Sequence, residues 1–468
     1  MSQDLASPPA STAPSEPNKV TIEDVIDRMP KVGLNWWAWL GLTLCFFFAN
    51  YDISVLAITL PAMRDSLGLE VAQLGYPVTW NLVGYAVGAY AFGLLSDRHG
   101  RQLGLFLTIA ALGIGGLLTA FSWDVWSLTV FRFITGAGMG AVLALCSAYI
   151  GEVAPKNKRG AYLSRLYLVG SVGLLVVGFA SLPVLTNLPE NGWRFLLAFG
   201  ALVLLVLPLI NKRALVESPR WLADQGRGKD AIAVVESMER FAKIESTIAD
   251  AQLVDEKRDK HEDAVERRSV FRSLFKPPYL GRLLTVLGFW FIFYVAMYGF
   301  ASYLPLLLEG LGVTTSNALF ITVLTRVAPL IAGVIVVALV ERIERRTLII
   351  AGTLVFASGI VLIILNLGPI GASAGSLLAT FGIAIMATPA YIYTAEVFPT
   401  RVRGTAAAIC DGVGHLGGAV APLVILPLLM TAGSVAAGIG MIALLIVAAI
   451  IIRLGVRTKD RALSDIAN

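Results

Sequence analysis

The stretch Tyr149-x-x-Glu152-Val153-x-Pro155-x-x-x-Arg159-Gly160 decides the fold, because it occurs twice in the chain. The second copy reads Tyr393-x-x-Glu396-Val397-x-Pro399-x-x-x-Arg403-Gly404, at an offset of 244 residues (152 to 396). The same offset aligns Asp97-Arg98 with Glu341-Arg342, Arg101 with Arg345, and Leu60-Pro61 with Leu304-Pro305. Several separated matches at a single offset indicate two structural repeats that run in the same direction along the chain.

The chain around these repeats is strongly apolar. Of its 468 residues, 56% are hydrophobic and 15% are charged, whereas soluble domains carry about 25% charged residues. Apolar segments lie at about 36–61, 72–95, 103–121, 126–150, 161–185 and 194–211, and again at about 280–307, 316–340, 348–366, 372–396, 404–430 and 434–453. Segments of this kind cross the hydrocarbon layer of about 30 Å as helices, and they lack the period-two alternation of barrel strands. The prediction is an all-α membrane protein with 12 transmembrane helices in two parallel-repeat six-helix bundles.

The distribution of charge divides the chain into five parts. We expect a disordered cytoplasmic N-terminal tail at 1–33, the first bundle at 34–211, a cytoplasmic linker with short amphipathic helices at 212–279, the second bundle at 280–455 and a cytoplasmic C-terminal tail at 456–468. Lys and Arg gather in the short loops on one side, for example Lys156, Lys158 and Arg159. The positive-inside rule places that side and both termini in the cytoplasm. We therefore expect a monomeric integral protein of the cell (inner) membrane.

The sequence predicts no cofactor, no metal site and no nucleic-acid partner. The three cysteines, Cys45, Cys146 and Cys410, lie inside apolar segments without CxxC spacing, so we interpret them as buried hydrophobes. The net charge of +5 comes without a basic patch interleaved with aromatic residues. The expected partners are the lipid bilayer, a small-molecule substrate and protons.

Three motifs carry a resemblance to a known family. Gly93-x-Leu95-Ser96-Asp97-Arg98-His99-Gly100-Arg101 resembles the signature loop between the second and third helices of the major facilitator superfamily. Arg132-x-x-x-Gly136-x-Gly138 resembles its fourth-helix motif, and Glu217-Ser218-Pro219-Arg220-Trp221-Leu222 resembles the sugar-porter and organic-ion branches. The resemblance covers about 33–456 and implies a transporter whose substrate sits between the two halves. The second signature loop departs from the pattern, with Glu341 for the usual Asp and Glu344 for the usual Gly.

Two further segments resemble one branch of this superfamily. Ala49-Asn50-Tyr51-Asp52 in the first helix is similar to the Asp-Gly-x-Asp motif of the aromatic acid:proton symporters. Gly414-His415-Leu416-Gly417 in the eleventh helix is similar to their Gly-Arg-x-Gly segment, with His415 where an Arg is common. This resemblance implies a proton-coupled transporter of aromatic or other organic acids.

Ionisable residues inside apolar segments are site candidates, because each costs about 2.5–3.5 kcal/mol or more to insert without a partner or a water-filled cavity. Asp52 is a candidate proton-coupling acid, because burial raises a carboxyl pKa and a neighbouring cation lowers it. Arg132 does not deprotonate, so we predict that it pairs with Asp52 and is released when Asp52 is protonated. The alternative is a permanent structural pair.

The second half supplies the candidate substrate site. Arg326 lies mid-helix without an acid one turn away, and its planar guanidinium suits a carboxylate. It either binds an anionic substrate or pairs with Asp411. Asp411 and His415 are four residues apart and share a helix face. His415 could contact substrate, relay protons or only pack, and a metal site is the remaining alternative.

Aromatic and amide side chains complete the predicted substrate site. Trp290, Tyr294 and Tyr298 recur every four residues and form one stripe, which faces either lipid or the central cavity. Tyr391 in the tenth helix and Asn50 in the first helix are further candidate substrate contacts.

Charged residues at the ends of helices form the predicted gating machinery. These are Asp97, Arg98, Arg101, Glu152, Arg159, Glu217, Glu341, Arg342, Arg345, Glu396 and Arg403. We expect Arg98 or Arg101 to bind Glu152, Arg159 to bind Glu217 and Arg403 to bind Glu396. Such pairs would hold when the transporter is open to the outside and break when it opens inward.

The function predicted is proton-coupled symport of a small organic anion, an aromatic or other monocarboxylate, by alternating access. A sugar or other neutral solute is the nearest alternative, although the apolar segments hold few Asn and Gln residues beyond Asn50 and Asn81. An organic-cation transporter with Asp52 as the cation's partner is a third. No nucleophile–base pair or metal set at membrane depth suggests an enzyme.

Overall fold

The computed structural model describes residues 21–458 apart from 211–213, 243–271, 273, 278, 341 and 399, and leaves the side chains of 337 and 400–405 undescribed. The first bundle contains α2 (Trp36–Leu67), η1 (Val71–Leu74), α3 (Gly75–His99), α4 (Arg101–Ala120), α5 (Val125–Val153), α6 (Arg159–Asn187), α7 (Gly192–Gly200) and η2 (Ala201–Leu209). The second contains α11 (Tyr279–Glu309), α12 (Thr315–Leu324), η3 (Thr325–Val327), α13 (Ala328–Leu339), α14 (Arg345–Ile364), α15 (Gly368–Glu396) and α16 (Thr400–Arg453).

The helices are long and apolar enough to span a membrane. Eleven stretches of the described residues qualify, and the last of them, Ala406–Arg453, is 48 residues long. It contains two helices, because Gly433 breaks the helical backbone with a φ of 82°, a conformation that glycine adopts without steric cost. The predicted all-α fold with 12 spans is therefore confirmed.

Glycines allow the helices of each bundle to approach closely. A Cβ atom on Gly136 of α5 would lie 2.0 Å from the carbonyl oxygen of Asn81 in α3, and one on Gly140 would lie 2.1 Å from that of Tyr85. In the second bundle, a Cβ on Gly382 of α15 would lie 2.3 Å from the amide nitrogen of Phe356 in α14. Close backbone packing at small residues stabilises helix pairs in lipid, where little hydrophobic driving force remains between helices.

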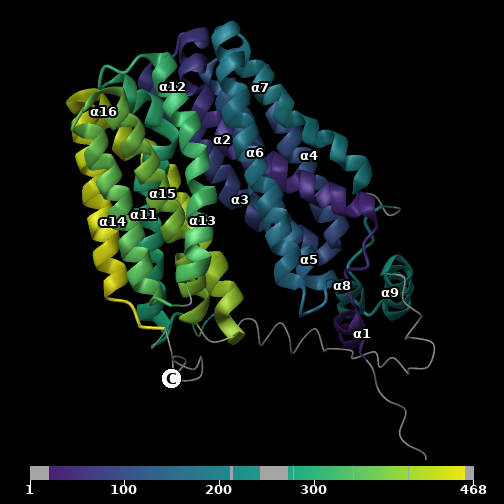
Figure 1. Ribbon diagram of the computed structural model, residues 1–468. Coiled ribbons are helices and arrows are strands. Elements are labelled where there is room, and N and C mark those ends of the chain that lie inside the picture. The colour runs from purple at the N-terminus through teal and green to yellow at the C-terminus, as the bar shows by residue number, and fades with distance from the viewer. Residues whose placement is uncertain are drawn as a thin grey trace, which may run out of the picture.

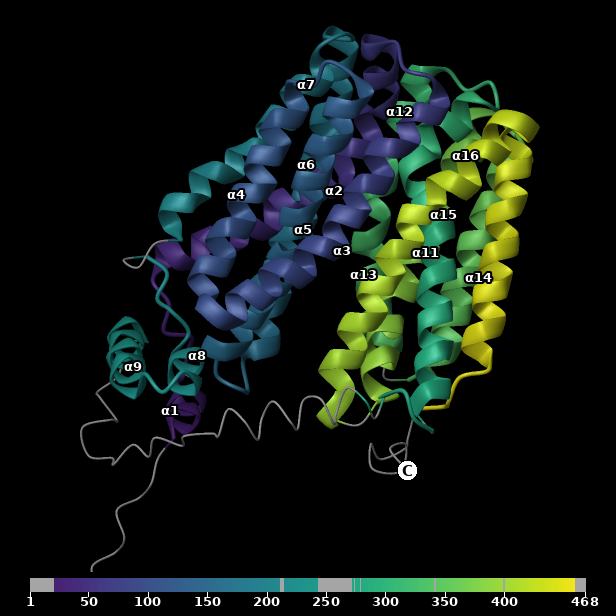
Figure 2. The ribbon, with the colours of Figure 1, turned by 180° about the vertical axis from the view of Figure 1, so that it is seen from behind.

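The two bundles converge at one end and diverge toward the other in both views (Figures 1 and 2). We call the end at which α3 meets α4 and α5 meets α6 the basic end, and the other the opposite end. At the opposite end Arg64 of α2 forms an ion pair with Glu309 of α11 at 3.4 Å, and the hydroxyl of Thr79 donates to the carbonyl of Ala419 at 2.9 Å. One buried apolar cluster there contains residues of both bundles, among them Leu60 and Leu306. The bundles are therefore closed against each other at the opposite end.

Three short helices, α1 (Ile22–Arg28), α8 (Pro219–Asp224) and α9 (Gly228–Ala242), lie at the basic end of the first bundle (Figure 1). The expectation of disorder at 1–33 is wrong for the end of that tail, because α1 begins with a capping box between Thr21 and Asp24 and buries Ile26. Arg220 holds it with ion pairs to Glu23 at 3.3 Å and Asp27 at 3.5 Å. The rest of the expected linker helices, over 243–271, lies outside the described residues.

Candidate functional site

Asp52 and Arg132 form a bidentate ion pair between α2 and α5. The two distances from the guanidinium to the carboxylate oxygens are 3.0 and 2.7 Å, and the side chains are 7% and 0% exposed. The predicted pairing is thus present. In this conformation both charged side chains are buried.

A small void lies beside this pair. Its volume is about 30 Å³ and its wall includes Ile53, Asn81, Tyr298 and Ser302, so residues of both bundles enclose it. That volume holds one water molecule. The amide of Asn81 donates to the carbonyl of Arg132 at 2.9 Å, which fixes the turn of α5 that carries the guanidinium.

Arg326 lies where the eighth span is interrupted, in η3 between α12 and α13. Pro329 cannot donate to the carbonyl of Thr325, and the backbone tightens so that Ala328 donates to it instead. The Nε atom of Arg326 is buried without a hydrogen-bond partner, and its side chain packs over Gly178 of α6 in the other bundle. No ion pair joins Arg326 to Asp411 or to any other acid among the residues that the structure describes. The structural pairing that we considered for Arg326 is therefore absent.

The carboxylate of Asp411 accepts a hydrogen bond from the last hydroxyl group in a chain of two tyrosines. Tyr391 donates to its carboxylate at 3.1 Å, and the hydroxyls of Tyr294 and Tyr391 are 3.0 Å apart. Because the Tyr391 proton is committed to the carboxylate, Tyr294 donates to Tyr391. The side chain of Asp411 is 33% exposed and Tyr391 is 49% exposed, so this chain begins in the packed interior of the second bundle and ends at an accessible carboxylate.

His415 is held by its own helix and by an aromatic ring of the other bundle. Its Nδ1 lies 2.9 Å from the carbonyl of Asp411 and 3.6 Å from the carboxylate. A carbonyl only accepts, so Nδ1 carries a proton and a neutral His415 presents Nε2 as an acceptor. The imidazole stacks on Tyr85 of α3, with centroids 3.9 Å apart and an angle of 10° between the rings. This stack is a contact between the bundles.

The aromatic stripe packs against α16. Trp290 and Tyr294 are buried, the ring of Tyr294 meets that of His415 edge-on at 5.0 Å, and Tyr298 covers Gly418. The indole of Trp290 donates to Thr394 at 3.0 Å and its ring lies 4.7 Å from that of Tyr391. The lipid-facing interpretation of the stripe is therefore wrong.

Asn50 does not meet these residues. Its amide donates to the carbonyl of Phe46, one turn earlier in the same helix, at 2.9 Å, and packs over Gly170 of α6. One of its two N–H donors is thus used by the helix backbone.

The signature loop at the basic end of the first bundle forms a compact cluster. Arg101 binds Glu152 at 2.8 Å and also pairs with Asp97, whereas Arg98 is exposed. Glu217 accepts from the backbone amides of Arg101, at 2.9 Å, and Gln102, and so caps the start of α4, where a carboxylate is favoured by the helix dipole. Burial raises the pKa of Glu217 above its usual value. The expected pairing of Glu217 with Arg159 is wrong, and the Nε of Arg159 is buried without a partner.

The second bundle repeats the arrangement. Arg345 binds Glu396 at 3.3 Å, at the positions related by the 244-residue offset to Arg101 and Glu152. The sequence predicts Arg403 in this role; its side chain lies outside the described residues, as does Glu341. Arg342, a further gating candidate of this bundle, also interacts with another group. Each of these pairs joins two helices of one bundle, and each is present in this structure.

A sequence profile of one family, described as the Major Facilitator Superfamily, matches residues 42–422. The chain belongs to the Major Facilitator Superfamily. It is an integral membrane protein and a secondary transporter, not an enzyme.

Relatives within the Major Facilitator Superfamily cover most of the chain. The 4-hydroxybenzoate transporter PcaK of Pseudomonas aeruginosa is 27% identical over 421 residues, which are 86% of this chain and 89% of that protein. The niacin transporter NiaP of Acinetobacter baylyi is 27% identical over 445 residues, 93% of this chain and 94% of that one. The inward-open structure of the xylose transporter XylE from E. coli superposes with a TM-score of 0.71 at 22% identity, covering 92% and 98% of the two chains. This last likeness shows the fold alone.

Sequence reasoning missed three contacts of this superfamily member. Tyr85 on His415 and Arg64 on Glu309 join the two bundles, and Thr394 anchors the indole of Trp290. The 244-residue offset maps Arg64 onto Leu308, the neighbour of Glu309. This nearly symmetric placement in the two repeats was the one signal that could have suggested a pair across the boundary between the bundles.

Proposed function

We propose that the chain is a proton-coupled symporter of a small organic anion, an aromatic or other monocarboxylate, that works by alternating access. The observation that carries the proposal is Arg326, a cation inside a membrane span without an acidic partner among the described residues. A guanidinium in a low-dielectric site is stable when an anion accompanies it, and a substrate carboxylate supplies one with bidentate geometry.

The position of Arg326 suits a transported ligand. The break at η3 leaves irregular backbone at membrane depth, a feature that transporters place at substrate sites. Because Arg326 packs over Gly178 of the first bundle, an anion bound there sits at the boundary between the bundles and senses their relative motion. The relatives named for 4-hydroxybenzoate and niacin carry aromatic carboxylic acids, which supports the same substrate class here.

The proton step is assigned to Asp52 and Arg132. Protonation of Asp52 removes the negative charge that holds the Arg132 guanidinium, and the bidentate pair cannot survive it. The pair is sealed in the conformation described, so the proposal requires that movement of the bundles exposes Asp52 through the void beside Asn81. His415, with Nε2 free of its own helix, and Asp411 shape the cavity on the other side.

The orientation completes the cycle. With the basic end in the cytoplasm, as the loop charges predict, the conformation with closed contacts at Arg64–Glu309 is the inward-facing one. The pairs Arg101–Glu152 and Arg345–Glu396 then keep each bundle rigid while it rocks, rather than tying one bundle to the other.

Two observations bear on the alternatives. The membrane amides of Asn50 and Asn81 each commit one N–H donor to a backbone carbonyl, which reduces the donors available to sugar hydroxyls and counts against a sugar. The accessible carboxylate of Asp411 beside aromatic rings would suit an amine, which is therefore included in the test.

The test is thermal-shift screening of the purified chain against carboxylates, sugars and amines. A ligand present at 100 times its dissociation constant stabilises a protein by about 2.7 kcal/mol, which is measurable as a shift in melting temperature. We expect an aromatic carboxylate to give the largest such shift. Arg326→Ala should abolish that shift, and Arg326→Lys should recover only part of it because an ammonium lacks the planar fork. Undiminished carboxylate stabilisation of Arg326→Ala, or a response to sugars or amines alone, would overturn the assignment.

A further inference from the structure

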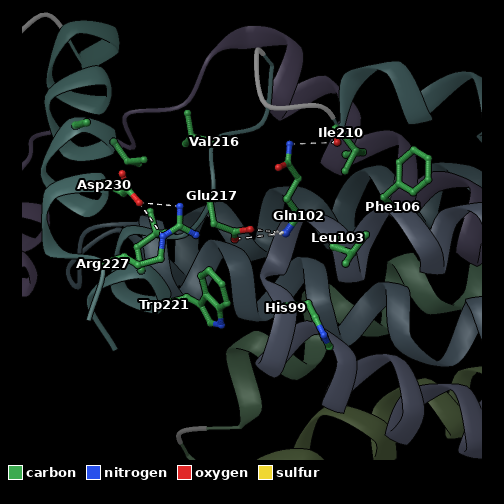
Figure 3. Close-up of a pocket in the computed structure, with 13 residues that line it drawn as sticks. His99, Gln102, Leu103, Phe106, Ile210, Val216, Glu217, Trp221, Arg227 and Asp230 are labelled. Atoms are coloured by element: carbon green, nitrogen blue, oxygen red, sulfur yellow. Dashed lines mark hydrogen bonds and ion pairs between the residues drawn. The ribbon is translucent and has the colours of Figure 1, made fainter. Parts of the chain in front are cut away.

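A large pocket lies at the basic end, away from the proposed transport site. Its volume is about 660 Å³, within the range of small-molecule sites. Its walls are formed by the start of α4, by the segment that follows η2, and by the helices α8 and α9 (Figure 3). Glu217 lies in its centre but is already engaged by the backbone of α4. The proposed transport mechanism makes no use of this pocket.

The pocket has a polar side and an apolar side. Asp230 of α9 and Arg227, the residue just before α9, lie at one edge, and Leu103, Phe106 and Ile210 lie at the other (Figure 3). Arg227 and Asp230 form an ion pair at 2.7 Å in which each side chain is 55% exposed. A solvent-exposed pair of this kind contributes about 1 kcal/mol or less, so either group can accept another partner at little cost.

The apolar side continues into the surface that faces lipid. Leu103 and Phe106 are 41% and 40% exposed, and Ile114 and Leu117 are exposed farther along α4. Their spacing of three and four residues, by way of Ala110, puts them on one face of the helix. Leu103 and Phe106 lie within the first two turns of α4, about 3 and 8 Å from its start at 1.5 Å per residue. The first turns of a membrane-spanning helix lie where lipid headgroups meet acyl chains.

We propose that this pocket binds a phospholipid whose headgroup carries both a phosphate and an ammonium. One acyl chain lies on Leu103, Phe106 and Ile210 and continues along the exposed face of α4. The phosphate pairs with Arg227 and the ammonium pairs with Asp230, so that the headgroup completes a cluster of two positive and two negative charges. A lipid with a net negative headgroup gains the contact with Arg227 and meets the carboxylates of Asp230 and Glu217 without compensation.

The bound lipid has a structural consequence. It bridges α4, a membrane helix, to α9, which belongs to the group of short helices at the basic end (Figure 1). The lipid thereby adds apolar and ionic contacts next to the carboxylate that caps α4. We expect it to hold α9 against the bundle and to raise the thermal stability of the purified protein.

Native mass spectrometry of the full chain, delipidated in detergent, tests the proposal. Phosphatidylethanolamine should bind more tightly than phosphatidylcholine, which has no N–H donor, and than phosphatidylglycerol, which has no cation. Arg227→Ala should weaken phosphatidylethanolamine binding about tenfold, the loss expected for one charge-assisted hydrogen bond. Arg240→Ala is the matched control, because Arg240 is an exposed arginine of α9 outside the pocket, and this variant should bind like the wild type.

A second variant makes the test independent of charge. Ala233 lies exposed on the pocket wall, so Ala233→Trp fills the space while leaving the ion pair intact, and should abolish the bound lipid and its stabilising effect. Equal lipid binding by this variant and the wild type would overturn the proposal. Stabilisation by soluble aromatic carboxylates that Ala233→Trp removes would overturn it too, because the pocket would then serve a soluble ligand.

Discussion

Replacing Asp52 by Asn tests the proton step most directly. The substitution keeps the shape of the side chain and removes its charge, so the Arg132 guanidinium loses contacts of 2.7 and 3.0 Å in a site where it is 0% exposed. Removing one partner of a buried ion pair costs about 3–5 kcal/mol. We expect Asp52→Asn near the lower value, because its amide oxygen still accepts one hydrogen bond from Arg132.

The functional magnitude follows from the proton gradient. One pH unit supplies about 1.4 kcal/mol, which is a tenfold accumulation for one proton per substrate. In liposomes with an imposed gradient, the wild type should accumulate a carboxylate identified by thermal shift, and Asp52→Asn should only equilibrate it. Exchange of labelled for unlabelled substrate should survive in the variant, because exchange needs the bundles to move with substrate but no net proton transfer.

A double variant separates coupling from stability. Asp52→Leu with Arg132→Met removes both charges together and should recover most of the lost stability, because apolar replacement of a whole buried pair is often neutral. It should not recover accumulation. Gradient-driven accumulation by Asp52→Asn, or by the stable double variant, would show that the pair is only structural and that the proton travels elsewhere.

Three further outcomes are expected. Gly136→Leu should eliminate monodisperse protein in size-exclusion chromatography, because a Cβ there meets the backbone of α3 at 2.0 Å, whereas Gly93→Leu, with open space around it, should elute normally; similar profiles would argue against the close crossing. Arg64→Glu or Glu309→Arg alone should raise maleimide labelling of a cysteine placed at Ser302 about fivefold from the opposite face, the effect of losing about 1 kcal/mol, and the double swap should restore it; no restoration would mean that the pair does not close the seam. Burial raises the pKa of Glu217, so the folded state binds more protons than the unfolded state just above pH 4.5, and stability should fall as pH rises through that window; Glu217→Gln should flatten this fall in a thermal melt, and an unchanged profile would contradict the burial argument.

Several site residues were predictable because a charged side chain inside a membrane carries a large free-energy cost unless it has a partner or a water-filled cavity. Asp52, Arg132 and Arg326 stand out in any reading of the apolar segments, and the pairing of the first two was expected. The partner of Arg326 was left open between substrate and Asp411, because the choice depends on which way two distant helices are turned. The structure separates Arg326 from Asp411 and gives the latter to Tyr391.

Errors arose where one charged group had several candidate partners within reach. Glu217 follows the sixth span closely, and Arg159 was a plausible partner by charge alone. The structure instead uses Glu217 to cap α4, since unsatisfied amides at a helix start compete for a carboxylate as effectively as a side-chain cation. Residues 22–28 were misjudged for a related reason. Their few apolar side chains gain stability only by packing against the group that contains α8 and α9.

The sequence by itself determined the spans, their duplication and the list of charges that need an explanation. These are local properties, because a helix satisfies its own backbone and its length must match the hydrocarbon layer. Only the tertiary structure decided which charges pair, which aromatic rings face inward and where the pocket at the basic end lies. Those outcomes depend on the rotation of each helix and on contacts between residues as far apart as Tyr85 and His415, which no local pattern encodes.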